Sequence, residues 1–143
     1  MSKLDLMELT ALSRRTHGLA HGDYSRYSRH CAVKVKKTLM AQRKYSADDT
    51  LTLLFKAERD WSRAMDLKAT GEPRKRHHAI KKFKRSVQYA HQLSVKLQGS
   101  DQELQIQAYT SLMRALLALE QQKYQIALDA FGLARFVFLN THD

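Results

Sequence analysis

The chain has 143 residues, a single cysteine and a formal net charge of +11. A chain of this length folds as one domain with an adequate core, so it needs neither a disulfide nor a structural metal. Its longest apolar runs, residues 115–119 and 136–139, are too short to cross a bilayer, and its N-terminus carries no secretory signal pattern. We therefore expect a soluble, intracellular, single domain over residues 1–143.

Positive charge is concentrated in the first hundred residues. Residues 1–46 hold 10 Lys and Arg against 3 Asp and Glu, and residues 47–100 hold 12 against 6. Residues 101–143 hold only 3 against 5. A cationic region joined to a near-neutral one predicts a polyanion-binding surface built on a packing scaffold. The polyanion could be RNA, DNA or an acidic membrane.

The scarcity of proline and glycine predicts an all-α fold. One proline and five glycines leave few breaks, and the expected helices cover residues 2–17, 22–44, 48–69, 73–98, 101–121 and 124–140. We expect about six antiparallel helices in three hairpins, arranged as in tetratricopeptide repeats. Tyr124, Ala127, Phe131 and Ala134 have the second-helix spacing of such a repeat.

The helix expected over residues 22–44 is basic on one side and apolar on the other. At 100° per residue, its cations separate from its apolar side chains. The cationic face carries Arg26, Arg29, His30, Lys37 and Lys44.

The third expected helix supplies packing residues. Trp61, the only tryptophan, has helical spacing to Leu54 and Met65, so we interpret it as a core anchor rather than a base-stacking residue. Glu58 lies among apolar neighbours, which leaves two readings. It forms a buried ion pair with an arginine of another helix, or it is partly exposed.

The fourth expected helix begins with a run of positive charge. Arg74, Lys75 and Arg76 follow Pro73 directly. Cations at a helix start oppose the helix dipole, whereas the free N–H groups there favour phosphate. The run therefore favours an anion bound in front of this helix.

The sixth expected helix is apolar around most of its circumference, from Ile126 to Leu139. Two explanations are open. The helix lies deep in the core, or its outer face meets a further segment or partner.

No enzyme signature is present in the sequence. It has no glycine-rich phosphate loop and no serine or cysteine nucleophile motif. His17 and His21 have the spacing of a metal-binding pair, but Gly18 interrupts the helix between them and no third ligand is near in sequence. We expect neither catalysis nor a metal or other cofactor.

Four sequence blocks carry a recognisable order of residues. They are His17–Tyr27, Ala57–Lys68, Glu72–His78 and Gln107–Tyr109, followed by Glu120, Tyr124, Ala127 and Phe131. Together they resemble the RNA-binding domain of the signal recognition particle 68 kDa subunit.

This resemblance implies a six-helix, tetratricopeptide-like domain that binds the particle's RNA at its multi-helix junction. There it would shape the RNA for assembly of the particle used in co-translational protein targeting. It also implies that the chain is the N-terminal part of a larger cytoplasmic subunit with a nucleolar stage during assembly. Pairing with the 72 kDa subunit would use a C-terminal region outside this chain, other particle proteins could be partners, and no membrane insertion is expected.

One segment departs from the family pattern. Ala20 and Ser28 stand where the family carries arginine, and the segment after Cys31 is rich in lysine with Val33 and Val35 interspersed. Because lysine lacks the bidentate fork of arginine, this segment favours phosphate contacts over base-specific contacts.

The basic faces and the resemblance together give the candidate RNA-binding residues. Most are cations, and the aromatic members are candidates for stacking on an unpaired base, although core packing is the alternative for both tyrosines. The candidates are His21, Tyr24, Arg26, Tyr27, Arg29, His30, Lys34, Lys36, Lys37, Arg43, Lys44, Arg74, Lys75, Arg76, His78, Lys81, Lys82 and Arg85.

Two rival functions remain open at this point. One is a tetratricopeptide-like protein-interaction module that binds acidic peptides with its positive surface. The other is association with anionic membranes, which is disfavoured because the apolar faces of both basic helices are needed for the core.

Overall fold

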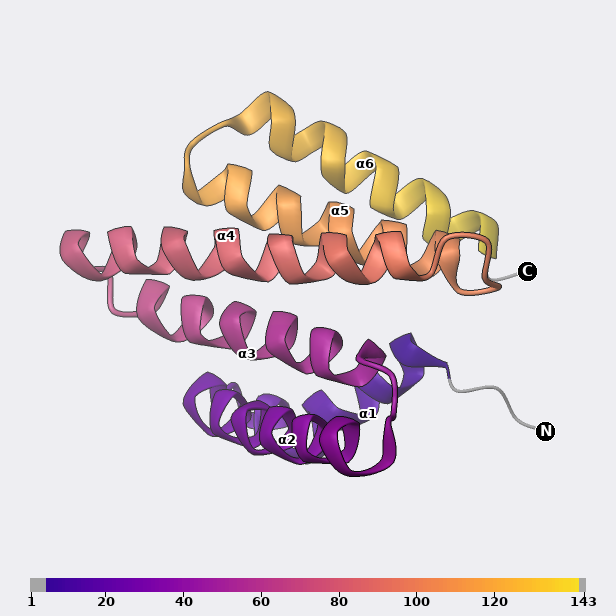
Figure 1. Ribbon diagram of the computed structural model, residues 1–143. Coiled ribbons are helices and arrows are strands. Elements are labelled where there is room, and N and C mark those ends of the chain that lie inside the picture. Colours follow the sequence, from indigo (N-terminus) through magenta and orange to yellow (C-terminus); the bar gives the residue numbers. More distant parts are fainter. Residues whose placement is uncertain (1–4, 142–143) are drawn as a thin grey trace.

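The computed structural model describes residues 5–141, with side chains described through residue 137. Within that range the chain is helical and contains no strand (Figure 1). The predicted six helices are confirmed, and a short 3-10 helix, η1, lies between the first two. The elements are α1 Leu6–Thr16, η1 Leu19–His21, α2 Tyr24–Tyr45, α3 Thr50–Lys68, α4 Pro73–Lys96, α5 Glu103–Glu120 and α6 Tyr124–Thr141. The expected start of the first helix, residues 2–4, lies outside the described residues.

Helices α2 to α6 pack in chain order, each against the next. Figure 1 shows them as successive layers, with α2 at one side and α6 at the other. Helix α1 lies across this array rather than extending it. The N–H of Leu6 donates to Oε1 of Gln102, in the link before α5, at 2.9 Å, and Arg14 reaches α3. The first helix thus ties the two halves of the array together.

The start of α2 is fixed by a tight turn around Gly18. This residue has φ +123°, and a Cβ atom added to it would lie 2.9 Å from the main-chain oxygen of Asp23. Asp23 then caps α2, as its carboxylate accepts from the N–H of Arg26 at 3.0 Å. A residue other than glycine at position 18 would therefore displace the first turn of α2.

A single buried carboxylate joins four helices. Glu58 on α3 is fully buried, and Arg14 donates to it from Nε to Oε1 and from Nη2 to Oε2, both at 2.7 Å. Tyr27 on α2 donates its hydroxyl to Oε1 at 2.8 Å, and Tyr109 on α5 donates to Oε2 at 2.7 Å. The predicted buried ion pair with an arginine of another helix is confirmed.

Trp61 packs beside this carboxylate. Its ring is 7% exposed, with the Arg14 guanidinium 4.0 Å from the ring centroid and the Tyr24 ring edge-on at 5.8 Å. The interpretation of Trp61 as a core anchor is confirmed.

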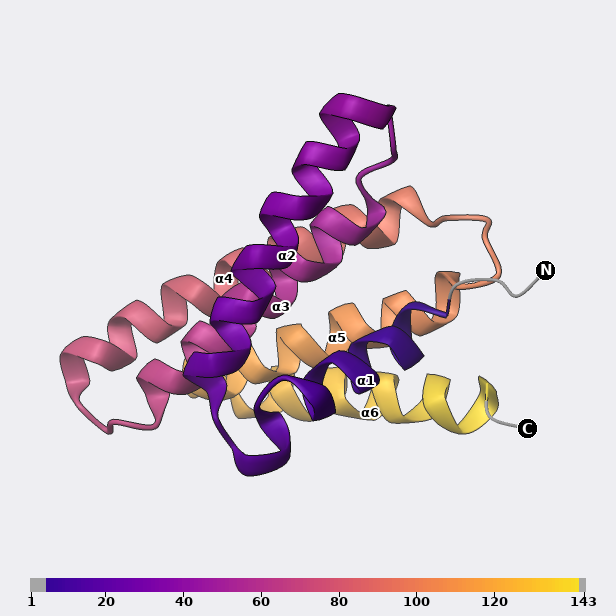
Figure 2. The same cartoon turned by 90° about the horizontal axis from the view of Figure 1, so that it is seen from below.

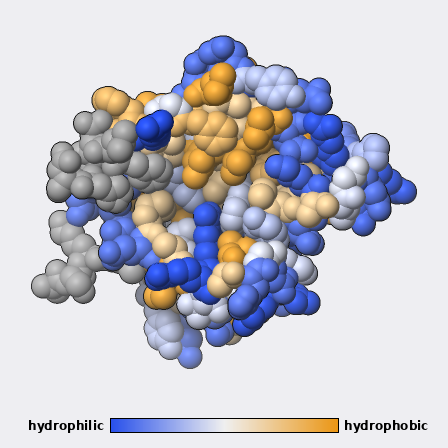
Figure 3. Space-filling model, turned by 180° about the vertical axis from the view of Figure 1, so that it is seen from behind, coloured by the Kyte–Doolittle hydropathy of each residue, from blue (hydrophilic) through white to orange (hydrophobic). Residues whose placement is uncertain are grey.

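Helix α6 is the outer layer of the array. Ala134 and Val137 are buried against Ala108 of α5 and Ala127 is also buried, so the small residues of the predicted repeat let α5 and α6 approach closely. Its other side is exposed and carries Tyr124, Ile126, Leu128, Leu133 and Phe136. Figure 3 shows apolar side chains gathered over the part of the molecule formed by α5 and α6. The reading that places α6 deep in the core is wrong for these residues, and Leu139 lies outside the described side chains.

The apolar content of the helices also decides whether one of them could span a membrane. In the part of the chain that the structure describes, no helix combines the length and apolar content needed to span a bilayer.

Replacing Glu58 by glutamine should lower the free energy of unfolding by about 3 kcal/mol, because removing one partner of a buried ion pair leaves the other without its counter-charge. Equilibrium unfolding in denaturant measures this loss. Asp66→Asn on the exposed side of α3 is the matched control and should change stability by less than about 0.5 kcal/mol. Equal stability of the two variants would contradict the central role of Glu58.

Candidate nucleic-acid interface

Helix α2 presents a row of cations to solvent along its whole length. Its buried side packs Tyr27, Cys31 and Val35 into the core, as the sequence pattern predicts. The opposite side carries exposed cations from the first turn to the last. These are Arg26, Arg29, Lys36, Lys37, Arg43 and Lys44, with Lys34 half-buried at the edge.

Tyr27 cannot have the base-stacking role considered for it in the sequence analysis. Its side chain is fully buried and its hydroxyl is bonded to Glu58. Burial next to that carboxylate raises the pKa of Tyr27 far above its usual value. It therefore cannot stack on a base, and its role is to hold α2 in place. Tyr24 is half-buried against Trp61, which leaves only part of its ring to a ligand.

The two histidine candidates on this side differ. His21 is exposed in η1. His30 is half-buried, and its ring stacks on His17 with centroids 3.4 Å apart. Burial, together with His17, Lys34 and Lys37, lowers the pKa of His30 to about 4. It is therefore uncharged at neutral pH and offers a ligand hydrogen bonds but no positive charge.

Helix α4 exposes a second row of cations. Arg74, His78, Lys81 and Arg85 face solvent. Lys75 lies 3.8 Å from the carboxylate of Glu72, one turn back. Because such an exposed pair is weak, Lys75 is readily available to another anion.

Arg76 is exposed but also forms an ion pair within the protein. Its Nε lies 3.2 Å from Oε1 of Glu120, and its Nη2 donates to the main-chain oxygen of Glu120 at 3.1 Å. Lys68 approaches the same carboxylate at 3.8 Å. Part of the positive run at the start of α4 is therefore offset by Glu120 at the end of α5, and the RNA contact of Arg76 stays a prediction.

Arg59 and Arg63 on α3, which the sequence analysis did not select, lie near Lys82 of α4. Burial and the charges of Arg85, Arg63 and Arg59 lower the pKa of Lys82, while Asp60 opposes the shift. Asp60 is fully buried, and its Oδ2 lies 3.4 Å from Nη2 of Arg59. Arg59 and Lys82 interact with this carboxylate, and Lys82 also interacts with Arg63 and Arg85, so cations outnumber this acid where α3 meets α4.

The sequence contained the signal for these two residues. Arg59 and Arg63 are spaced one turn apart on the side of α3 away from Leu54, yet α3 was interpreted only as a packing helix. Their position matters because α3 lies between the two basic helices.

The structure brings no metal ligands together among the residues it describes. No group of three His, Cys, Asp or Glu side chains there could hold a metal ion. His17 stacks on His30 instead of pairing with His21.

Comparison with known proteins identifies the fold and the family. Residues 19–140 match the family described as RNA-binding signal recognition particle 68. The signal recognition particle subunit SRP68 of Drosophila melanogaster is 28% identical to the chain over 166 residues, which cover 96% of this chain and 27% of that protein. The chain thus spans about a quarter of the length of this curated relative.

A solved structure shares the fold. The SRP68-RBD from Chaetomium thermophilum superposes with a TM-score of 0.82 and 22% sequence identity, covering 97% of this chain and 84% of that one.

The low pKa of His30 predicts an acid-sensitive fold. In the unfolded chain a histidine binds a proton near pH 6.5, whereas folded His30 binds one only near pH 4. The unfolded state therefore holds the extra proton between these values, and stability should fall as the pH falls through this window. Denaturant unfolding at pH 7, 6, 5 and 4 measures it. His30→Gln should flatten the dependence, whereas His21→Gln, an exposed control, should leave it unchanged.

Proposed function

Since this chain belongs to the RNA-binding signal recognition particle 68 family, we propose that its basic helices bind the particle's RNA at the junction where several RNA helices meet. The chain would act as one RNA-binding domain, the N-terminal part of a larger subunit, and would shape the RNA for assembly. The cations of α2, α3 and α4 would contact phosphates on neighbouring strands.

The observation that carries this proposal is the presence of cations on three adjacent helices. Helices α2 and α4 both pack on α3, and Arg59 and Arg63 of α3 lie close enough to Lys82 of α4 to lower its pKa. Lone lysine-rich surface helices are common, but three adjacent helices with few exposed acids are not explained by solvation alone. A polyanion in front of them supplies the missing counter-charge.

The angle between the basic helices favours a junction over a plain duplex. Figure 2 shows α2 crossing the direction of α4 rather than running parallel to it. Side chains enter the narrow, deep major groove of A-form RNA mainly where loops, bulges or junctions widen it. Two basic helices at an angle can each contact one of two RNA strands that diverge.

The partners follow from the same proposal. We propose that the chain works in the cytoplasm after a nucleolar stage of assembly, and that pairing with the 72 kDa subunit uses a region beyond residue 143. Pull-down of that subunit by this chain alone would contradict the second point.

The junction RNA of the particle should bind more tightly than an RNA duplex of equal length, and the preference should persist as salt rises. Shape recognition survives screening, whereas non-specific attraction fades. Titrations from low to high salt with both RNAs measure this. Equal affinities that fall together would reduce the proposal to a non-specific basic surface, and competition by an excess acidic peptide would favour the protein-interaction alternative.

Arg26→Ala combined with Arg29→Ala should weaken junction binding and flatten the salt dependence by about two units, because each lost phosphate contact removes about one. Lys123→Ala, an exposed cation in the link between α5 and α6, should change neither. Arg76→Ala should lower the free energy of unfolding, since its partner is Glu120. It should change the salt slope by less than the double variant does. An unchanged slope in the double variant would remove the start of α2 from the interface.

A further inference from the structure

The end of α2 carries an exposed aromatic side chain that the proposed function does not use. Tyr45 is 71% exposed and Met40 is 67% exposed, the two highest values among the large apolar side chains that the structure describes. They belong to a shallow, open hollow of about 600 Å³ on the surface of α2. Its lining is formed by Lys37, Met40, Ala41, Arg43, Lys44 and Tyr45.

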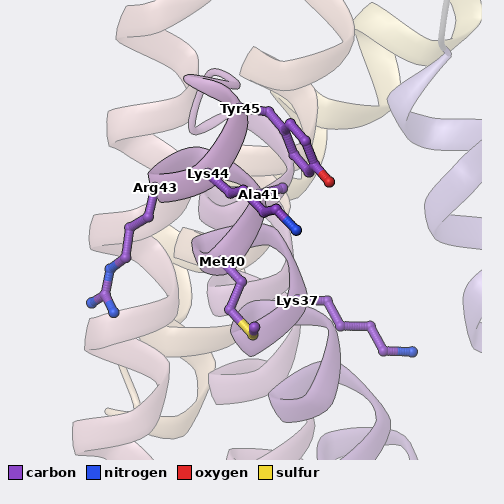
Figure 4. Close-up of a pocket in the computed structure, with 6 residues that line it drawn as sticks. All are labelled: Lys37, Met40, Ala41, Arg43, Lys44 and Tyr45. Carbon is purple, nitrogen blue, oxygen red and sulfur yellow. The ribbon is translucent and has the colours of Figure 1, made fainter.

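The charge around this hollow is entirely positive. Figure 4 shows Lys37 and Lys44 pointing to the same side of α2 as the Tyr45 ring, whereas Arg43 points away. The Nζ atom of Lys44 lies 5.4 Å from the ring centroid of Tyr45, within the range of a cation–π contact. An apolar platform edged by cations is thus presented directly to solvent.

The nearby acids are already engaged. Asp49, in the link that follows α2, is ion-paired with Lys96 of α4, and the carboxylate of Asp48 accepts from the N–H of Thr50 at 3.1 Å. In the part of the chain that the structure describes, neither Lys37 nor Lys44 is ion-paired with a carboxylate, so both are available to an anion.

A nucleotide matches both halves of this surface. Its base offers a flat face that stacks on tyrosine, its phosphate pairs with lysine, and such stacking tolerates any base. In a paired A-form helix the base faces are covered, so the base must be unpaired.

We propose that Tyr45 is a stacking platform for an unpaired RNA base, with Lys37 and Lys44 on the phosphates beside it. This inference rests on the proposed function, since it assigns a second contact to the same RNA. Tyr45 lies 19 residues beyond Arg26, which is about 28 Å along a helix. The two ends of α2 would therefore touch separate parts of the RNA, with the unpaired base at the far end.

The test compares Tyr45→Ala and Tyr45→Phe in the chain of residues 1–143. The probes are the junction RNA, which has unpaired bases, and a fully paired duplex. Tyr45→Ala should bind the junction RNA about tenfold more weakly with an unchanged salt slope, because a neutral ring releases no counterions. Tyr45→Phe keeps the ring and should stay within about twofold of the unaltered chain. Neither change should affect the duplex.

Leu128→Ala is the matched control, since Leu128 is 65% exposed on α6 and should leave RNA affinity unchanged. Circular dichroism establishes that each variant is folded. A second readout replaces single unpaired bases by 2-aminopurine, whose fluorescence should be quenched at one position by the unaltered chain and not by Tyr45→Ala.

The outcomes separate the two proposals. If Tyr45→Ala binds the junction RNA normally while the Arg26 and Arg29 double variant does not, the stacking platform is wrong and the proposed function stands. If the unaltered chain shows no preference for the junction RNA, the proposed function fails and this inference with it. If Tyr45→Ala loses only binding to phosphatidylserine vesicles, the platform belongs to a lipid surface and the inference is overturned.

Discussion

The carboxylate of Glu58 is the fixed point of this fold. It accepts four hydrogen bonds from α1, α2 and α5 while it sits on α3. A buried carboxylate is tolerated only when its charge is paired and its oxygens are saturated, so each of these helices is held at a defined rotation. For α2 the consequence is direct. Tyr27 must face Glu58, and its neighbours Arg26 and Arg29 must then face solvent.

The interior and the cationic surface are therefore parts of one arrangement. Concentrating positive charge on adjacent helices costs stability through self-repulsion, and the chain offsets this with a few well-placed acids. Asp60 lies within the cations of α3 and α4, Glu120 holds Arg76, and Asp49 holds Lys96. Each of these acids offsets a cation of α3 or α4, and the exposed cations of α2 keep their charge for a polyanion. Selective neutralisation of this kind distinguishes a binding surface from charge that merely keeps a protein in solution.

Local pattern was enough to predict the helices, the two faces of α2 and the burial of Trp61. Glycine and proline mark the breaks, and the period of 3.6 residues separates core from surface. The hydrogen bond from Tyr27 and the ion pair of Arg76 could not be predicted, for a different reason. Their partners, Glu58 and Glu120, are 31 and 44 residues away, and no local rule connects residues so distant. Arg59 and Arg63 were missed because one helix can pack on one side and bind on another, and the strong apolar signal of α3 concealed its cations.

The exposed apolar side of α6 has a consequence for how the protein behaves in solution. Leu128, Leu133 and Phe136 sit at the opposite edge of the array from the basic row of α2, so the molecule has two surfaces with opposite responses to salt. Raising the salt concentration screens the cations and releases bound nucleic acid, while strongly hydrated salts such as sulfate strengthen contacts between apolar surfaces. A sulfate wash that strips RNA from this domain would therefore also promote self-association through α6. A chloride salt would release the RNA with less effect on the apolar contacts.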